Sequence, residues 1–281
     1  MRVVRTVGEV RNALRAPRSA GAVVGFVPTM GALHAGHVSL LRRAHAGTDF
    51  VVISVFVNPT QFNDPADLAA YPRDEAHDEA VARDAGVDLF FAPDASEIYP
   101  PGFATAVSVD RLSAPMEGAV RGPGHFRGVA TVVTKLFNIV APDVAYFGQK
   151  DAQQALIVRR LARDLDLPLR IEVCPTVREP DGLAMSSRNA RLTPADRVRA
   201  LALRRGLDAA EASIAAGERD VATVARVGRE AMRAHGVDPE YFELVSAETL
   251  EPLDRVAGEV LVAVAARVGP VRLIDNVVVS V

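Results

Sequence analysis

The sequence has no tryptophan, a single cysteine and few aromatic residues, which make up 5% of the chain. One cysteine cannot form a disulfide within the chain. Cys174 follows the strand-like segment 169–173 and no cysteine–histidine signature accompanies it, so we interpret it as a buried strand thiol rather than a catalytic nucleophile. So few aromatic rings leave little material for stacking nucleic-acid bases. A formal net charge of -3 favours neither a nucleic acid nor a membrane surface as a partner.

Long apolar segments are also missing. The first ten residues lack the apolar core of a signal peptide, and no apolar run reaches the length of a membrane-spanning helix. A chain of 281 residues, with 49% hydrophobic and 24% charged residues, is typical of a globular protein with two domains. We therefore expect a cytoplasmic enzyme with no membrane or nucleic-acid partner.

Up to about residue 177, short apolar runs alternate with helical patterns. Strands are expected at residues 22–27, 50–57, 87–92, 144–147 and 169–173, and helices at residues 73–85, 126–140 and 152–166. This alternation predicts a parallel sheet with helices on both faces. Residues 1–177 are thus expected to form a Rossmann-like α/β domain that binds a nucleotide.

The pattern changes in the last third of the chain. Two helices, at residues 194–216 and 220–235, precede strands at 240–245, 259–266 and 271–279. Helices followed by strands predict a smaller α+β domain over residues 178–281. The polar loop at 178–192 would lie near the hinge between the two domains.

The segment His34-Ala-Gly-His37 lies where the first expected strand gives way to a helix. A helix that begins near Gly36 or His37 would direct unpaired backbone N–H groups and a positive dipole end into the turn, which favours phosphate. Both imidazoles could donate hydrogen bonds to phosphate oxygens, and Gly31 and Gly36 would let a nucleotide approach the backbone. A metal site would need a further ligand that is missing locally, and two surface histidines without a role are the other alternative. The strand, turn and histidine pair favour chemistry on a nucleotide phosphate.

Other polar segments follow expected strands and should reach the same edge of the sheet, because the carboxyl ends of parallel strands meet there. Gln61 follows the second strand, and Gly148–Asp151 follows a later one, with Lys150 as a cation for phosphate. Gln61 and Gln154 suit a hydroxylated substrate. The loop Met185–Arg188 could wrap a pyrophosphate. Taken alone, each could equally be a helix cap, a solvated loop or a surface glutamine.

Two further groups of charged residues are less specific. The glycine-rich loop from Arg121 to Arg127 could approach a carboxylate or phosphate, or be only a turn. Four acidic residues are expected to form a solvated face and a helix start, and one of them could help to hold Mg²⁺: Asp64, Asp67, Asp74 and Asp78.

Five segments together resemble the pantothenate synthetase (pantoate–β-alanine ligase) family. They are PTMGALHAGH at 28–37, FVNPTQF at 56–62, HFRGV at 125–129, YFGQKDAQQ at 146–154 and DGLAMSSRN at 181–189. Their order and spacing extend over the whole chain. The histidine motif alone marks only the wider HxGH nucleotidyltransferase superfamily, whereas Gln61 with Gln154 and the 181–189 segment are more specific.

The resemblance implies an ATP-dependent condensation of (R)-pantoate with β-alanine. The products would be pantothenate, AMP and pyrophosphate, formed through a pantoyl adenylate in pantothenate and coenzyme A biosynthesis. The resemblance also implies Mg²⁺ and a homodimer built through the first domain.

Site residues can be carried over by position. His37, the expected proton donor, His34 and Lys150 would be catalytic, Gln61 and Gln154 would bind pantoate, and Gln61 would also bind β-alanine. The ATP-binding residues would be Met30, Gly31, Ala32, Leu33, His34, Ala35, Gly36, His37, Gly148, Gln149, Lys150, Asp151, Val177, Met185, Ser186, Ser187 and Arg188.

The chain departs from the family pattern at two places. Gln149 stands where many relatives carry Glu, and the Arg121 loop is one residue longer before His125, so Arg121 is kept out of the predicted site. Two alternatives to the synthetase are a nucleotidyltransferase that makes a stable nucleotide conjugate and a nucleotide-binding regulatory module without catalysis. The intact His34, His37, Lys150 and Ser186–Arg188 argue against the regulatory module.

Overall fold

The structure is a computed structural model that describes residues 1–281. The chain forms two compact units. The first comprises Met1–Gly148 and Gln153–Pro175, and the second comprises Gln149–Ala152 and Thr176–Val281. The short segment Gln149–Ala152 therefore belongs to the second unit, although the chain before and after it belongs to the first. The division at residue 177 that the sequence indicates stays a prediction.

The first unit contains a six-stranded sheet in the order β1-β4-β3-β2-β5-β6, and all its strand pairs are parallel. The strands are β1 (Arg2–Val4), β2 (Val24–Thr29), β3 (Phe50–Val55), β4 (Leu89–Phe91), β5 (Val144–Gly148) and β6 (Arg170–Cys174). The predicted parallel α/β sheet is confirmed. The edge strand β1 was not predicted, because three residues are too few to show a pattern.

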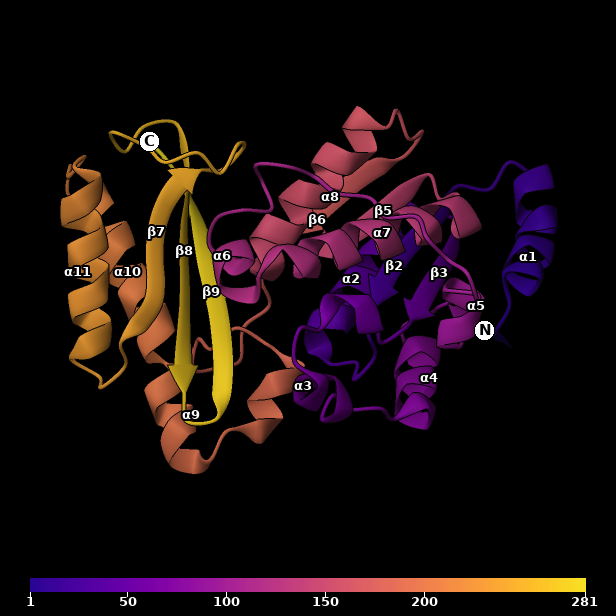
Figure 1. Ribbon diagram of the computed structural model, residues 1–281, viewed down its shortest axis with the longest axis horizontal. Helices are drawn as coiled ribbons and strands as arrows, with labels where there is room; N and C mark the ends of the chain where they lie inside the picture. The colour runs from indigo at the N-terminus through magenta and orange to yellow at the C-terminus, as the bar shows by residue number, and fades with distance from the viewer. The chain divides into compact units, whose positions relative to one another are not determined.

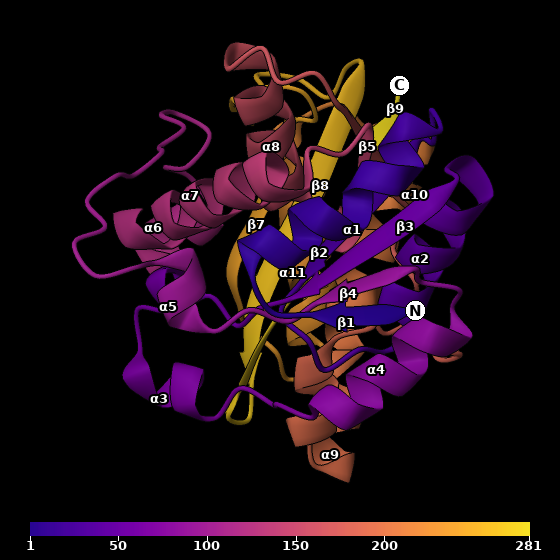
Figure 2. The same ribbon diagram turned by 90° about the vertical axis from the view of Figure 1, so that its right-hand side faces the viewer.

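Helices cover both faces of this sheet. They are α1 (Val7–Ser19), α2 (Ala35–Gly47), α3 (Pro65–Ala69), α4 (Glu75–Asp84), α5 (Ala95–Ile98), α6 (Glu117–Arg121), α7 (Pro123–Val140) and α8 (Ala152–Asp164). Helices α1 and α7 lie on one face, and α2 and α4 lie on the other (Figure 2). None of the helices in the chain is both long and apolar enough to cross a membrane.

Adjacent residues of one strand show how the sheet is buried on both sides. The ring of Phe26 packs edge to face on that of Phe137 of α7, with 6.4 Å between the ring centroids. The next residue, Val27, joins the opposite cluster with Leu41 of α2 and Ile53 of β3. Burying each of these larger side chains contributes about 1.5–3 kcal/mol. The uninterrupted apolar runs of the sequence therefore correspond to strands covered on both faces.

The second unit packs helices on one face of an antiparallel sheet in the order β7-β8-β9. Its elements are η2 (Gln149–Asp151), η3 (Ser187–Arg191), α9 (Pro194–Ala200), α10 (Ala202–Ala215), α11 (Val221–Arg233), β7 (Pro239–Ser246), β8 (Glu259–Val268) and β9 (Val271–Ser280). Helices α10 and α11 lie side by side against the strands (Figure 1). The predicted small α+β domain is confirmed.

The prediction of one helix over residues 194–216 was wrong, because the helix is interrupted at Leu201. Ala200, Ala202 and Leu203 are all almost completely buried in the core of the second unit. In a straight helix Ala200 and Ala202 would point roughly 200° apart, so both could not face one core. No glycine or proline marks the break, so the sequence pattern did not reveal it.

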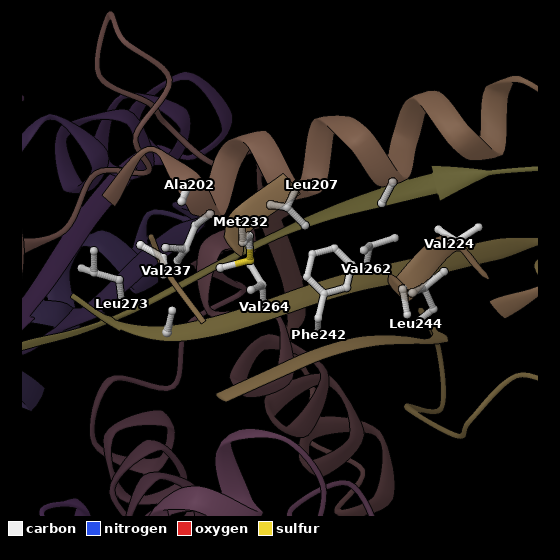
Figure 3. Packing of buried hydrophobic residues seen from close by; sticks show 14 of the residues in the cluster. Ala202, Leu207, Val224, Met232, Val237, Phe242, Leu244, Val262, Val264 and Leu273 are labelled. Carbon is white, nitrogen blue, oxygen red and sulfur yellow. The ribbon is translucent and has the colours of Figure 1, made fainter. Parts of the chain in front are cut away.

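The core of the second unit joins its helices to its sheet. Leu207 of α10 and Met232 of α11 lie over Phe242 of β7 and Val264 of β8 (Figure 3). Close approach of α11 depends on Gly228, since a Cβ there would lie 2.2 Å from the Phe242 ring. This core is separate in composition from the clusters of the first unit, so each unit has its own apolar interior.

Candidate functional site

The turn between β2 and α2 is held by two histidines that cap the helix. Helix α2 begins at Ala35 with His34 as its N-cap, one or two residues earlier than the start predicted near Gly36 or His37. The backbone N–H of Gly36 donates to Nδ1 of His34 (3.1 Å), and the backbone N–H of His34 donates to Nδ1 of His37 (3.2 Å). Histidine stands here in both positions of a capping box, where Ser or Thr and Glu or Gln are more usual.

This capping determines what the imidazoles can offer to a ligand. A ring nitrogen that accepts a hydrogen bond carries no hydrogen, so in each neutral ring the hydrogen is on Nε2. The ring centroids of His34 and His37 are 4.1 Å apart, with 36° between the ring planes. Two N–H donors are therefore grouped at the N-terminal end of a helix, where the dipole also favours an anion.

Asp78 of α4 binds the backbone of the same turn. The prediction that it lies on a solvated face was therefore wrong. Its side chain is buried, and its two carboxylate oxygens accept from the backbone N–H groups of Ala32 (2.9 Å) and Leu33 (2.7 Å). Burial raises the pKa of Asp78, and these two hydrogen bonds oppose that shift. Gly31 (φ 81°) and Ala32 (φ 51°) both have left-handed backbone conformations. The buried carboxylate thus satisfies the N–H groups that this strained turn leaves unpaired.

The other acidic residues of that group do behave as expected. Asp64 accepts from the backbone N–H of Ala66 and caps α3, and Asp74 accepts from that of His77 and caps α4. Asp67 lies in the first turn of α3.

Gln61 is oriented by a buried amide that the sequence did not single out. Asn58 is 1% exposed, and its Oδ1 accepts from the hydroxyls of Tyr99 (2.8 Å) and Thr60 (2.9 Å). Its Nδ2 donates to the carbonyl of Gly128 (3.2 Å) and to Oε1 of Gln61 (3.0 Å). The backbone carbonyl can only accept, so the amide orientation of Asn58 is fixed and Gln61 presents its NH₂ group on the other side.

Three predicted segments follow neighbouring strands of the first unit. β2 lies between β3 and β5, so the histidine turn is flanked by the carboxyl ends of the strands that precede Gln61 and Gln154. The NH₂ group of Gln61 reaches Sδ of Met30 at 3.2 Å, which brings the second segment against the first. Gln154 is half-buried in the first turn of α8. The expected edge of the sheet therefore gathers polar groups from separate loops.

The segment from Arg121 to Arg127, predicted as a loop or turn, is mostly helical, because Arg121 ends α6 and Pro123 begins α7. The Arg121 guanidinium pairs with the carboxylate of the buried Glu117, with 2.9 Å between Nε and Oε2. His125, in the first turn of α7, has Nδ1 2.8 Å from the backbone carbonyl of Gln61. His125 therefore supports Gln61, a role that its place in a family motif could have suggested.

In the second unit, Gln149–Asp151 forms the short helix η2. Lys150 is half-buried and Asp151 is exposed, with 3.5 Å between Nζ of Lys150 and Oδ1 of Asp151. The backbone carbonyls of Gln149 and Lys150 accept from Nδ2 of Asn276, at 3.0 and 2.9 Å. Sequence reasoning missed Asn276, because it lies inside a strand and in no recognised motif.

The loop that carries the serines and arginine is also in the second unit. The backbone N–H of Met185 donates to the carbonyl of Val177 (3.0 Å), and that of Arg188 donates to Oγ of Ser186 (3.2 Å). Val177 and Met185–Arg188 are all half-buried. Arg178 makes a two-pronged ion pair with the buried Asp275, which holds the start of this loop on β9.

Cys174 is a buried thiol at the end of β6, as predicted. Burial, with a smaller effect of the Glu172 carboxylate, raises the pKa of this thiol to about 11. A thiol of such high pKa is almost entirely protonated at neutral pH and is a poor nucleophile.

A parallel sheet that places a glycine turn and a helix N-terminus beyond a central strand is the arrangement of nucleotide-binding α/β proteins, and the first unit belongs to that class. The model of one family, described as Pantoate-beta-alanine ligase, matches residues 2–278. The chain therefore belongs to the pantoate-beta-alanine ligase family.

Individual relatives agree along the whole length. The chain is 51% identical to a pantothenate synthetase of Roseiflexus castenholzii over 281 residues, covering all of both chains. It is 53% identical to pantothenate synthetase 1 of Bradyrhizobium diazoefficiens, covering 100% of this chain and 99% of the relative.

Solved structures show the same similarity. Pantothenate synthetase from Thermus thermophilus superposes with a TM-score of 0.93 at 50% identity, covering 99% of each chain. A pantoate-beta-alanine ligase from Francisella tularensis, solved in complex with beta-gamma ATP and β-alanine, has a TM-score of 0.82 at 33% identity. That match covers 99% of this chain and 97% of the other. The resemblance seen in the motifs is confirmed, and the family reaction is the joining of pantoate to β-alanine to form pantothenate.

Proposed function

We propose that this chain makes pantothenate from pantoate, β-alanine and ATP in two steps. First, a carboxylate oxygen of pantoate attacks the α-phosphorus of ATP and pyrophosphate leaves, giving a pantoyl adenylate. Then the amine of β-alanine attacks the acyl carbon, the C–N bond forms, the nitrogen loses a proton and AMP leaves. The observation that carries this proposal is the reciprocal capping of His34 and His37, which directs two N–H donors to the N-terminus of α2.

The two imidazoles would act on the α-phosphate. Negative charge builds up on its oxygens during attack, so donors that are already oriented stabilise the transition state more than the ground state. Nε2 of His37 would donate a proton or hydrogen bond to the phosphate, with Nε2 of His34 beside it. The turn from Met30 to His37 would bind ATP through the two imidazoles and the positive dipole end of α2, because the N–H groups of Ala32, Leu33, His34 and Gly36 already donate within the turn.

Gly148, the last residue of β5 in the first unit, would bind ATP, and so would Gln149–Asp151, Val177 and Met185–Arg188 of the second unit. Lys150 would place a positive charge near phosphate oxygens, and the side chain of Arg188 offers paired donors for the same kind of group. The hydrogen bonds from Asn276 to the carbonyls of Gln149 and Lys150 and from Met185 to Val177 support these roles, because they give both segments a defined backbone.

Gln61 and Gln154 would hold pantoate. The amide of Gln61 faces Asn58 with its oxygen, so its NH₂ group would donate to a hydroxyl or carboxylate oxygen of pantoate. Gln61 would also contact β-alanine. Holding a carboxylate in line with the scissile bond is the main task left to the protein in a nucleotidyl transfer.

Mg²⁺ would enter with ATP. The chain has no group of three or more His, Cys, Asp or Glu side chains that could form a metal cage. Mg²⁺ in nucleotide sites usually takes one or two carboxylates and completes its shell with phosphates and waters, so this donor set fits a cation held mainly by ATP. The exposed Asp151 could supply one carboxylate. When bound, the ion would neutralise phosphate charge.

The assembly would be a homodimer built through the first domain, and the protein would act in the cytoplasm without a nucleic-acid or membrane partner. The family resemblance supports the dimer. Sedimentation equilibrium is expected to give twice the chain mass of 29.9 kDa, and a single-chain mass would contradict the dimer.

Product analysis tests the reaction. Incubation with ATP, Mg²⁺, (R)-pantoate and β-alanine is expected to give pantothenate, AMP and pyrophosphate in equal amounts, and ADP in place of AMP would contradict the proposal. Without β-alanine, pyrophosphate release is expected to stop at about one equivalent per site. Continued release without an amine would favour a nucleotidyltransferase that makes a stable conjugate.

A further inference from the structure

Asn276 is a buried amide whose side chain contacts residues that are distant in sequence. It lies on β9 with 4% of its surface exposed, and it pairs across the sheet with Ala263 of β8. Neither residue belongs to the apolar cluster under α10 and α11, so both face the opposite side of the sheet. All the side-chain hydrogen bonds of Asn276 go to Gln149 and Lys150.

The orientation of this amide is unambiguous. Nδ2 donates to the backbone carbonyls of Gln149 (3.0 Å) and Lys150 (2.9 Å), which can only accept. Oδ1 therefore faces the NH₂ group of Gln149, which donates to it at 3.0 Å. Two of these hydrogen bonds hold the peptide groups on either side of the Lys150 Cα, and the third holds the side chain of Gln149.

The neighbouring residue of β9 holds the other ATP-binding segment expected in this unit. Asp275 is 3% exposed and accepts from both terminal nitrogens of Arg178, at 2.6 and 2.9 Å. Arg178 also donates to the carbonyl of Gly182 (3.1 Å) and forms a backbone bridge with Ala184. Two adjacent strand residues thus hold the segments that begin at Gln149 and at Val177.

We propose that Asn276 is a positioning residue for the ligase reaction, holding the backbone of Gln149 and Lys150 so that the Lys150 ammonium is directed at the phosphates of ATP. This inference rests on the proposed role of Lys150 in ATP binding. Asn276 itself touches no substrate. Its effect is on the affinity for the nucleotide and not on the binding of pantoate or β-alanine.

The test compares Asn276→Ala, Asn276→Asp and Lys150→Ala with a matched control, Val278→Thr. Asn276→Asp keeps the shape but sets a carboxylate oxygen against two carbonyls, whereas Asn276→Ala removes the donors without adding charge. Val278 is on the same strand, is exposed and pairs with Leu261 of β8, so Val278→Thr should keep wild-type kinetics.

In Asn276→Ala we expect the KM for ATP to rise at least tenfold, with the KM for pantoate changed less than twofold. Backbone hydrogen exchange in residues 149–152 should become faster in this variant and in Asn276→Asp, and the melting temperature of Asn276→Ala should fall by only a few degrees, because two carbonyls lose their donors while the fold is kept. In the Lys150→Ala background, adding Asn276→Ala should raise the KM for ATP by less than a further factor of two, because both changes remove the same interaction.

Failure of the proposed reaction and failure of the role of Asn276 would give different results. A wild-type protein that forms no pantothenate would refute the proposed function. Lys150→Ala with wild-type kinetics would refute the role of Lys150 and this inference together. A defect in Lys150→Ala without one in Asn276→Ala, equal rises in the KM of ATP and pantoate, or fully multiplicative losses in the double variant would overturn the inference alone.

Discussion

The rings of His34 and His37 both cap the start of α2: the backbone N–H of His34 donates to Nδ1 of His37, and the backbone N–H of Gly36 donates to Nδ1 of His34. In each ring one nitrogen is thus bound to the backbone and the other carries the hydrogen. The structural and chemical roles of each histidine are divided between its two nitrogens.

The separate roles of the two ring nitrogens of His37 can be tested with asparagine, whose side-chain oxygen can replace Nδ1 but not Nε2. Asn at position 37 places an oxygen near the site of Nδ1 and can keep the cap, but it has no group at Nε2. We expect His37→Asn to keep the melting temperature of wild type and to lose roughly 100-fold or more in pantothenate formation, a loss typical of removing one donor to a developing oxyanion. His37→Ala should lose the activity and also about 1 kcal/mol of stability with the cap.

His45→Asn is the control, since His45 is an exposed residue in the last turn of the same helix. It should retain full activity. Wild-type turnover in His37→Asn would refute the role assigned to Nε2.

Any substitution that adds a side chain at Gly31 is expected to destabilise the protein. Its φ of 81° is unfavourable for other residues, and a Cβ would lie 2.7 Å from Oδ2 of Asp78. We expect Gly31→Ala to lower the free energy of unfolding by about 1–3 kcal/mol, measured by urea denaturation, and to reduce activity because the histidine turn must shift.

Gly8→Ala provides the contrast for this substitution. Gly8 lies in helix α1, and a Cβ at this position would have nothing within 4 Å, so alanine there should stabilise the protein by about 0.5–1 kcal/mol. Equal effects of the two substitutions would show that the close contact with Asp78 does not matter.

Asp78 should make stability depend on pH. Burial raises the pKa of this carboxyl in the folded protein above its unfolded value. Its contribution to stability is then fully present below the unfolded pKa and is lost as the pH rises through the folded pKa. The free energy of unfolding of wild type minus that of Asp78→Asn should therefore fall as the pH is raised from about 4 towards 7.

The comparison with Asp78→Asn removes the pH dependence that does not involve the carboxyl of Asp78. Chemical denaturation of both proteins at a series of pH values measures the difference between their free energies of unfolding. A difference that grows with pH would mean that the hydrogen bonds from Ala32 and Leu33 outweigh burial.

Cys174 should be unreactive in the folded protein. With a pKa of about 11 only about one thiol in a thousand is ionised at pH 8, and the side chain is buried. We expect an aromatic disulfide reagent to label less than a tenth of the thiol in an hour at pH 8, and to label all of it at once in denaturant. Rapid labelling of the native protein would contradict the burial of β6 at this residue.

Much of the fold could be predicted because its strands are buried on both faces. Apolar runs such as residues 50–57 show that burial directly, and the alternation with helices fixes parallel pairing. The short edge strand β1 and the break at Leu201 escaped prediction, because the first is too short for a pattern and the second depends on the shape of the core. Local periodicity carries no information about either.

The candidate site was predictable where its residues stand in a contiguous motif. His34, Gln61 and Lys150 stand in such segments, and the structure places each in the segment that follows a strand of the parallel sheet. Asp78 and Asn276 could not be found in this way, since their partners lie 45 or more residues away in sequence. An acidic residue on a helix and an amide inside a strand acquire their roles only when the fold brings a distant backbone to them.

The chain passes between the two units at residues 148–149, 152–153 and 175–176. A fragment ending at residue 175 would contain the carbonyls of Gln149 and Lys150 without Asn276, and the remaining fragment would contain Asn276 without those carbonyls. Neither piece could rebuild the Lys150 segment alone. A chimera between relatives would therefore have to exchange residues 149–152 together with 176–281. These two stretches are far apart in sequence but must come from the same parent protein.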